Sequence, residues 1–389
     1  MTVTRDFPKT PLTTKTRESA SVLPSAPPTA PQPCVPPSGT KIIDIRCSQA
    51  SLLDSLDTQI LEGLRQPHGS KSMPPLLLWD EKGQTLYDDI LATQYYYPYR
   101  VENELLQQRI DDITATVASS RTDLVVELGA GNMSKTASFL ASLDKYLDAP
   151  VMYYALDVDR SQLESSLSTL KERTNLHHIE LRGLLGTYDD GAKWLAGPET
   201  TNLRKTMVWL GNSIANFDQC EASDLMGSFA KAPDTGVPQN LAGFLLAVDG
   251  CQDGTRIGLA YDVPSGESRR WVMYALEAAK RQLAGDGDTE EAERLFDVDN
   301  WGFEGRWEPE LRRYQNYLVP IKRLEGTIRG QVISLEKGER VQVLGSGKWT
   351  KSDVSGISSK QGLDVRKWWS STEVDYGKGM HPLIYHLGN

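Results

Sequence analysis

The fold prediction starts from Val125-Val126-Glu127-Leu128-Gly129-Ala130-Gly131. In this segment an apolar strand leads into a helix through a turn that contains two glycines. Glycine lets the backbone approach a ligand closely, and the N-terminus of the following helix, predicted over residues 134–146, offers free N–H groups. A dinucleotide fingerprint requires a third glycine where Ser134 stands, which counts against a nicotinamide cofactor. A tight turn without a ligand is the plain alternative for this motif.

Strands and helices alternate from this stretch onward. Apolar strands are predicted at 124–128, 151–156, 179–184, 206–210 and 243–248, with helices at 134–146, 161–172 and 219–230. Nearly continuous apolar strands that alternate with helices favour a parallel sheet covered on both faces. Right-handed crossovers make that sheet doubly wound, and ligands of such sheets bind at the carboxyl ends of the strands.

The segments around the sheet predict a second lobe. Residues 41–100 precede the alternation, and a long amphipathic helix is predicted over 101–118. After Val248 the alternation stops: helices are predicted within 256–282, a surface loop at 285–293, and strands within 317–335 and 340–344. We therefore expect 41–100 and 251–346 to form a discontinuous α+β substrate-binding lobe, and 101–250 with 347–389 to form the sheet domain. Residues 1–40 hold nine of the 21 prolines and predict a disordered tail.

Composition excludes several classes of function. The 389 residues hold 42 Lys and Arg against 52 Asp and Glu, a net charge of −10, which argues against an extended nucleic-acid surface. No apolar run approaches the ~20 residues of a membrane span, and no secretory signal is evident. Four cysteines without a C-x-x-C pair and five histidines without metal spacing predict reduced thiols and no metal. We expect a cytoplasmic protein that contacts neither membrane nor nucleic acid.

Polar residues follow two more of the predicted strands. Asp157 ends the second strand, where an acidic side chain accepts hydrogen bonds from ribose hydroxyls. A glycine turn and an acidic strand end without a diphosphate fingerprint suit an adenosine ligand such as S-adenosylmethionine (SAM). Asn212 and Asn216 follow the fourth strand, where a side-chain carbonyl can accept the N–H of an amine. The alternatives are a helix cap for Asp157 and ordinary turn residues for the asparagines.

Aromatic residues gather ahead of the sheet. Trp79, Tyr87 and the run Tyr95-Tyr96-Tyr97 lie close together in the sequence. A methyl-transfer site holds a sulfonium and produces a methylated ammonium, and ring faces stabilise both cations by roughly 0.5–2 kcal/mol. Ordinary core aromatics are the alternative interpretation.

Three motifs together resemble the histidine α-N-methyltransferases of ergothioneine biosynthesis. They are Pro74-Pro75-Leu76-Leu77-Leu78-Trp79-Asp80-Glu81-Lys82-Gly83, Tyr95-Tyr96-Tyr97-Pro98-Tyr99-Arg100-Val101-Glu102 and Glu127-Leu128-Gly129-Ala130-Gly131-Asn132-Met133-Ser134-Lys135-Thr136. The resemblance runs from about Pro74 to the C-terminus and extends to fungal tryptophan and dimethylallyltryptophan N-methyltransferases. It implies a Rossmann-like class I SAM-dependent methyltransferase domain with a discontinuous substrate lobe.

The resemblance also implies site residues, carried over by motif. Implied cofactor-binding residues are Gly129, Gly131, Lys135, Asp157, Thr187, Tyr188 and Gly211, of which Thr187 and Tyr188 replace an Asp-Phe pair that contacts adenine. The polar contact to adenine would then come from Thr187 or from a backbone group. The implied catalytic residues are Asn216, at the substrate amine, and Tyr96; Tyr261 and Ser346 would hold the carboxylate, and Tyr87 and Trp79 would line the pocket.

One departure from the family indicates the substrate. Histidine enzymes carry a glutamate that grips the imidazole, and Leu344 stands at that position, with Asn316 near a position that often holds methionine. A buried carboxylate–imidazole bond contributes roughly 1.5–3 kcal/mol, so histidine loses its anchor, and an apolar wall suits an indole or phenyl ring. We expect α-N-methylation of tryptophan or a derivative such as 4-dimethylallyltryptophan, with S-adenosylhomocysteine as coproduct. The alternatives are histidine or tyrosine, or a non-catalytic SAM-binding protein; we expect a monomer.

Overall fold

The computed structural model describes residues 41–46, 49–131, 133–284, 288–370 and 383–388. The chain divides into two units, residues 1–39 and residues 40–389. The predicted disordered tail at 1–40 lies outside the described residues, so the architecture below is that of the second unit.

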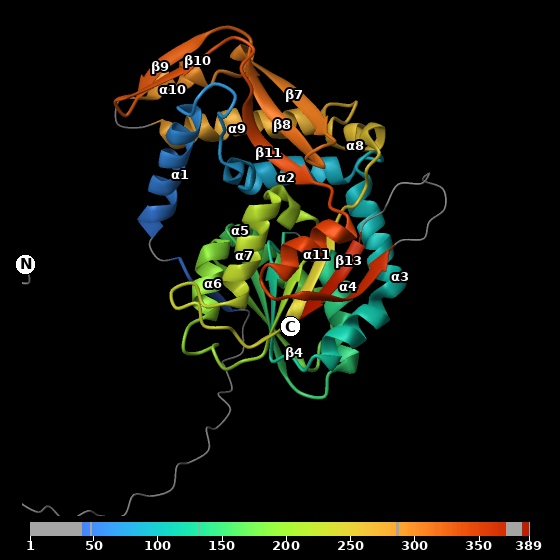
Figure 1. The fold of residues 1–389 in the computed structure, drawn as a ribbon. Coiled ribbons are helices and arrows are strands. Elements are labelled where there is room, and N and C mark those ends of the chain that lie inside the picture. The colour runs from blue at the N-terminus through green and yellow to red at the C-terminus, as the bar shows by residue number, and fades with distance from the viewer. Residues whose placement is uncertain (1–40, 47–48, 132, 285–287, 371–382, 389) are drawn as a thin grey trace, which may run out of the picture. The chain divides into compact units, whose positions relative to one another are not determined.

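In the described part of the chain, eight strands form the main sheet (Figure 1). Their order across the sheet is β1 (Lys41–Asp44), β4 (Ile179–Leu185), β3 (Val151–Asp157), β2 (Leu124–Leu128), β5 (Lys205–Trp209), β6 (Leu241–Val248), β13 (Leu383–Gly388) and β12 (Asp364–Ser370). Neighbours from β1 to β6 pair in parallel, whereas β13 pairs antiparallel with both β6 and β12. The chain therefore winds outward in both directions from β2, as the alternation predicts.

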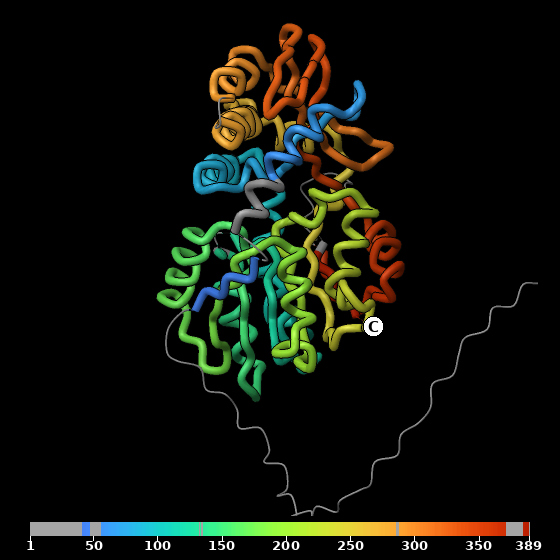
Figure 2. The backbone as a smooth tube through the Cα atoms, turned by 90° about the vertical axis from the view of Figure 1, so that its left-hand side faces the viewer, coloured from blue at the N-terminus to red at the C-terminus, as the bar shows by residue number. Residues whose placement is uncertain are grey.

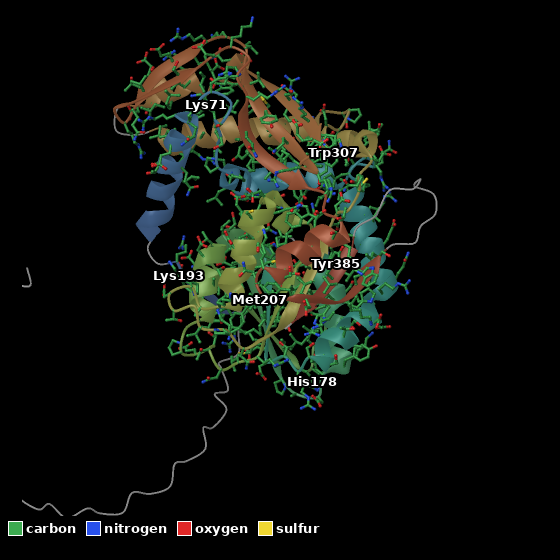
Figure 3. The ribbon with its side chains drawn as sticks, viewed as in Figure 1. Lys71, His178, Lys193, Met207, Trp307 and Tyr385 are labelled. Carbon is green, nitrogen blue, oxygen red and sulfur yellow. The ribbon has the colours of Figure 1, made fainter. Side chains whose placement is uncertain are left out.

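Helices cover both faces of this sheet. The helices α3 (Tyr97–Ser119), α4 (Ser134–Leu143) and α5 (Arg160–Arg173) share one core with Val125 and Val208. The helices α6 (Tyr188–Leu195), α7 (Gln219–Ala230) and α11 (Lys351–Ser359) share a second core with Val126 and Met207. Neighbouring residues of one strand thus enter opposite cores. Figure 3 labels Met207 and Tyr385, which both belong to the second core.

A second lobe is assembled from segments on either side of the sheet in the sequence. Its helical parts are α1 (Gln49–Leu64), η1 (Pro75–Leu78), α2 (Glu81–Leu91), α8 (Gly254–Tyr261), α9 (Glu267–Leu283), α10 (Thr289–Leu295) and η4 (Val298–Asn300). Its strands are β7 (Trp301–Glu308), β8 (Arg313–Pro320) and β11 (Val341–Gly347), with the hairpin β9 (Leu324–Ile328) and β10 (Gln331–Leu335). Leu78 from the early segment and Leu276 and Leu318 from the late segment share one core, and Figure 2 shows the two segments side by side.

The sequence prediction differs from the structure at particular elements. Residues 41–44, expected in the substrate lobe, form the edge strand β1 and pair with β4. Helix α3 begins at Tyr97 instead of Val101, because Pro98 fits the first helical turn, where its missing N–H costs nothing. Part of the surface loop predicted at 285–293 is the helix α10. The short elements α6, β7, α11 and β12 were not predicted.

Helix α6 shows why short elements escape detection. It has eight residues, which are too few to show a clear apolar period. It begins at a capping box, in which the Thr187 side chain accepts the backbone N–H of Asp190 and the Asp190 side chain accepts the backbone N–H of Thr187. No helix in the described part of the chain is long and apolar enough to cross a membrane. The remaining boundaries between the two predicted domains stay predictions.

Candidate active site

The loop after β2 has a backbone conformation that glycine adopts most readily. Gly129 and Gly131 have φ angles of 70° and 54°, in the left-handed region. A Cβ atom on Gly129 would lie 2.7 Å from the Tyr188 hydroxyl oxygen. The N–H of Gly131 donates to Asp157 Oδ2 over 3.2 Å. The two glycines therefore form an open cradle at the carboxyl edge of the sheet, tied to the end of the neighbouring strand.

Asp157 is fixed at the end of β3 by backbone donors. Its Oδ1 accepts the N–H of Val158 over 2.7 Å and the N–H of Asp159 over 3.3 Å. Burial raises the pKa of its carboxyl, against the opposing effect of these N–H groups. The alternative role as a helix cap is wrong, because Asp159 caps α5 by accepting the Gln162 N–H. Asp157 thus lines the cavity with its position set and its remaining lone pairs available.

Lys135 and Gly211 both bind the same carboxylate, that of Glu102, a residue that was not predicted to belong to the site. Lys135 Nζ lies 2.9 Å from Glu102 Oε1, and the same oxygen accepts the Gly211 N–H over 2.8 Å. The ammonium also lies 5.1 Å from the centre of the Tyr99 ring, a cation–π distance. Glu102 therefore joins the first turn of α4 to the loop after β5, both of which line the cavity.

Thr187 and Tyr188 both line the cavity, but they differ in what they can offer. The Thr187 hydroxyl donates to Asp190 Oδ2 over 2.8 Å and accepts the Asp190 N–H over 3.2 Å. Its hydrogen is therefore used within the cap of α6, which favours a backbone group for the polar contact to a nucleobase. The Tyr188 ring lies 5.1 Å from the Trp209 ring, and burial raises the pKa of Tyr188 to about 12, so the phenol is neutral.

An aromatic wall formed by Trp79, Tyr87 and Trp271 lines the same cavity as the glycine loop. The Trp79 ring centre lies 5.3 Å from those of Tyr87 and Trp271, and Tyr87 and Trp271 are 5.0 Å apart. Trp271, which was not predicted as a site residue, is buried, and its Nε1 has no hydrogen-bond partner among the described residues. The three rings all line the cavity and lie at distances typical of favourable aromatic pairs. They supply an aromatic cluster of mutually inclined rings, packed edge to face around Trp79, with one unpaired N–H.

Tyr96 and Tyr261 continue this wall toward the sheet. The hydroxyls of Tyr87 and Tyr96 are 3.1 Å apart, and the rings of Tyr96 and Tyr261 meet edge to face at 5.5 Å. Tyr261 in turn stacks on Tyr314 at 5.1 Å. Burial raises the pKa of Tyr96 and of Tyr261 well above the usual value. Both phenols therefore stay protonated and serve as hydrogen-bond donors instead of bases.

The hydroxyls of Tyr261 and Ser346 lie 2.9 Å apart. Lys348 Nζ approaches them at 2.7 Å and 3.2 Å respectively. Lys348 also forms a buried ion pair with Asp249, 3.1 Å away. The structure thus brings the Tyr261 and Ser346 hydroxyls together, beside a charged pair that no sequence motif indicated, and their role in carboxylate binding stays a prediction.

Leu344 and Asn316 lie next to each other on two adjacent strands. They are Cα partners in the antiparallel pairing of β11 with β8, and both line the cavity. Asn316 is only 2% exposed, and its Oδ1 has no hydrogen-bond partner within the described part of the chain. A buried polar atom without a partner costs about 1–3 kcal/mol. The structure therefore places an apolar group and an unpaired acceptor side by side where the predicted substrate ring would lie.

Asn216 ends the short helix η3 (Ser213–Asn216), which follows β5 and lines the cavity. Arg313 clamps this turn: its guanidinium donates to the carbonyl oxygens of Ala215 at 3.1 Å, Phe217 at 2.5 Å, and Asn216. The clamp is buried, and burial lowers the pKa of Arg313. The backbone that carries Asn216 is thus held firmly in place at the cavity.

The glycine loop and the aromatic wall line one shared cavity of about 1270 Å³. This volume accommodates two small molecules together. Among the described residues, no group of three or more His, Cys, Asp or Glu side chains could hold a metal ion. The volume of the cavity therefore suits two ligands bound side by side in one chamber.

The comparisons with known proteins agree with this geometry. The family described as histidine-specific, SAM-dependent methyltransferases matches residues 56–380. The chain belongs to this family. The N-methyltransferase imqF of Aspergillus flavus is 36% identical over 90% of each chain. The 4-dimethylallyltryptophan N-methyltransferase easF of Claviceps purpurea is 29% identical, and the L-tryptophan methyltransferase trpM of Psilocybe serbica is 28% identical; each alignment covers 86% of this chain and 96% of the relative.

As a member of this family, the chain is a SAM-dependent methyltransferase with the class I sheet, and the cradle fits that cofactor. A Cβ on Gly129 would fill the space between the loop and Tyr188, and Lys135 and Asp157 lie on either side of the loop, where they suit a carboxylate and ribose hydroxyls. When bound, SAM supplies an electrophilic methyl group. The individual residue assignments on both sides of the cavity stay predictions.

Proposed function

We propose that this methyltransferase transfers methyl groups to the α-amino group of an aromatic amino acid, with tryptophan or a derivative such as 4-dimethylallyltryptophan as the first candidate. The observation that carries the proposal is Leu344 beside the unpaired Asn316. Asn316 Oδ1 offers one acceptor, which can take one ring N–H, and Leu344 offers no polar atom, so an imidazole would leave its second ring nitrogen without a partner. An indole presents apolar carbon to Leu344 and an N–H to Asn316 Oδ1.

The aromatic wall supports the same substrate class. Trp79, Tyr87 and Trp271 stand around one side of the cavity at mutual ring distances of 5.0–5.3 Å. A planar indole gains aromatic contacts there, and a methylated ammonium nearby is stabilised by ring faces. Two relatives whose names specify tryptophan substrates share this family, whereas the name of the relative at 36% identity specifies no substrate.

The mechanism rests on positioning. Bringing the amine and the electrophilic carbon into line in one chamber converts a bimolecular reaction into an effectively unimolecular one. The side-chain carbonyl oxygen of Asn216 accepts an N–H of the substrate amine. This hydrogen bond directs the nitrogen lone pair toward the cofactor side of the cavity. The buried phenols of Tyr96 and Tyr261 are neutral and cannot act as strong bases. The amine therefore reacts after losing its proton to solvent, and the rate should rise with pH up to the pKa of the amine.

Tyrosine is the second candidate, on a specific observation. Two residues that line the cavity each carry a buried polar atom without a partner in the described part of the chain, the acceptor Asn316 Oδ1 and the donor Trp271 Nε1. A phenol hydroxyl can donate and accept at once, whereas an indole N–H only donates. Phenylalanine offers neither function and should bind less tightly than both.

A substrate panel tests the proposal. The purified chain is incubated with SAM and histidine, tryptophan, 4-dimethylallyltryptophan, tyrosine or phenylalanine, and the product masses are read. Mass gains on the indole substrates support the proposal and give the number of methyl groups added; gains on tyrosine alone support the second candidate. Turnover of histidine in preference to every other amino acid would refute the role given to Leu344.

A further inference from the structure

A buried ion pair lies directly behind the candidate carboxylate site, and the mechanism above does not use it. Lys348 Nζ and Asp249 Oδ2 are 3.1 Å apart, with side chains 0% and 1% exposed. Neither residue lines the cavity. A buried pair of this kind is weak evidence for stability, because desolvation offsets the attraction between the charges. The role of the ion pair is therefore inferred from the hydrogen bonds that it makes to neighbouring residues.

Lys348 has as many partners as it has protons to donate. An ammonium carries three N–H donors and no acceptor. Besides Asp249, its partners are the hydroxyl oxygens of Tyr261 at 2.7 Å and Ser346 at 3.2 Å. Both hydroxyls must therefore present a lone pair to Lys348, and neither can point its hydrogen toward it.

Asn212 occupies the second lone pair of Ser346. Its Oδ1 accepts the backbone N–H of Asp249 over 2.8 Å, which fixes the orientation of the amide. The donor Nδ2 then faces Ser346 Oγ at 3.2 Å. Asp249 is itself held by the Tyr97 hydroxyl at 2.6 Å and the Cys251 N–H at 3.0 Å. With two donors on its oxygen, Ser346 can only donate.

The same count orients Tyr261. The 2.9 Å contact between the two hydroxyls must run from the Ser346 hydrogen to the Tyr261 oxygen, because Ser346 has no lone pair left to accept. Tyr261 then accepts from both Lys348 and Ser346, so its own hydrogen can only be donated, either to the neighbouring Tyr96 hydroxyl or to an anion in the cavity. When an anion enters, the Ser346 hydrogen can turn to it as well. The site thus presents hydrogens alone, in front of a positive charge.

We propose that Lys348, held in place by Asp249, is a positioning residue that keeps the Tyr261 and Ser346 hydroxyls in the donor orientation and thereby makes a free α-carboxylate a requirement for substrates. This inference rests on the proposed function and adds a determinant of specificity to it. Donors backed by a cation favour a carboxylate and give no advantage to an amine that has lost its carboxyl group.

The test compares an amino acid with its decarboxylated amine. Wild-type enzyme is assayed with tryptophan and with tryptamine, or with whichever amino acid of the panel is the substrate and its amine. The double variant Lys348→Met/Asp249→Asn removes both charges, so no unpaired charge stays buried. We expect kcat/KM for the amino acid to fall about tenfold to a hundredfold, with KM rising, while the value for the amine and the affinity for SAM stay unchanged.

The single variant Lys348→Arg, which keeps the charge, serves as the matched control and should retain part of the preference for the acid. A purely structural role for the pair predicts equal losses for acid and amine together with weaker SAM binding, and that result would overturn the inference. One measurement needs no variant: wild-type enzyme that methylates tryptamine or tryptophan methyl ester as efficiently as tryptophan also overturns it.

Failure of the proposed function looks different. A folded wild-type chain that binds SAM in calorimetry and methylates no aromatic amino acid refutes the proposed function. The inference is then decided by binding, through calorimetric titration of the S-adenosylhomocysteine complex with each amino acid and its amine. Tighter binding of the acids in the wild type, lost in the double variant, supports the inference, and equal binding of acids and amines refutes it.

Discussion

Replacing Asn316 by leucine should make the protein more stable and a poorer enzyme. In the ligand-free protein the Asn316 Oδ1 is buried and has no partner among the described residues, which costs about 1–3 kcal/mol. Leucine has a similar length and no polar atom, so Asn316→Leu should recover about 1–2 kcal/mol of that cost. At about 2 cal/mol/K per residue of unfolding entropy, this raises Tm by about 1–3 °C.

The activity should change in the opposite direction. In the Asn316→Leu variant, an indole N–H or a phenol O–H placed against the new leucine side chain would lose its acceptor. The cost is about 1–3 kcal/mol, or about five- to 150-fold in kcat/KM. Turnover of phenylalanine, which carries no such donor, should change little. The assay is kcat/KM for tryptophan, tyrosine and phenylalanine, together with calorimetric unfolding of the ligand-free protein.

The neighbouring Gln315 provides the matched control. Its Oε1 accepts from Gln342 Nε2 over 3.0 Å, and it does not line the cavity. Gln315→Leu removes a satisfied bond and should lower the stability while leaving the ratio of tryptophan to phenylalanine turnover unchanged. Equal loss of tryptophan and phenylalanine turnover in Asn316→Leu, or a fall in its Tm, would refute the reasoning.

Three further predictions concern other parts of the site. Leu344→Glu should shift the preference toward histidine, measured as the ratio of kcat/KM for histidine to that for tryptophan; an unchanged ratio would mean that residue 344 does not contact the substrate ring. Arg313→Met frees the turn that carries Asn216, so kcat should fall about tenfold or more while the affinity for SAM, read by calorimetry, is retained; weaker SAM binding would contradict a role confined to that turn. Burial raises the pKa of Glu127 to about 7 from an ordinary 4.5, against the opposing effect of its bonds to Tyr153 and Thr136. The folded protein therefore holds this proton more tightly than the unfolded chain, and the contribution to stability, complete below pH 4.5, is lost as the pH rises through about 7. Denaturant titrations should show a smaller loss over this window in Glu127→Gln, and identical pH profiles would contradict the assignment.

The sequence predicted the parts of the site that depend on local pattern. The strand ending at Leu128 and the glycines after it need only a short apolar run and two residues free to adopt positive φ, and the structure has both. Asp157 was placed correctly because carboxyl ends of parallel strands meet at one edge of a sheet. The helix over 219–230 matches α7 at both ends, since Asp218 and Glu221 form a capping box.

The residues that were missed act through contacts distant in sequence. Glu102 bonds to Gly211, Arg313 to Asn216, and Lys348 to Asp249, and no periodicity relates such partners. Trp271 was not predicted, because in the sequence it is one of several apolar residues of a helix. A buried charge can be interpreted only when its partner is known, so these contacts emerge from the fold and not from the sequence alone.

The order of residues along β11 has an evolutionary consequence. Leu344 and Ser346 lie two positions apart on one strand, so the same short segment carries the proposed contact for the substrate ring and the proposed contact for its carboxylate. Mutations at Leu344 and at its partner Asn316 leave the hydroxyl pair and its buried cation untouched. On the proposed roles, changes at these two positions would alter the preference among amino-acid side chains while the proposed carboxylate contact is kept. The proposed contact for the group that all amino acids share would then stand beside a separate proposed contact for the side chain in which they differ, so the two could vary independently.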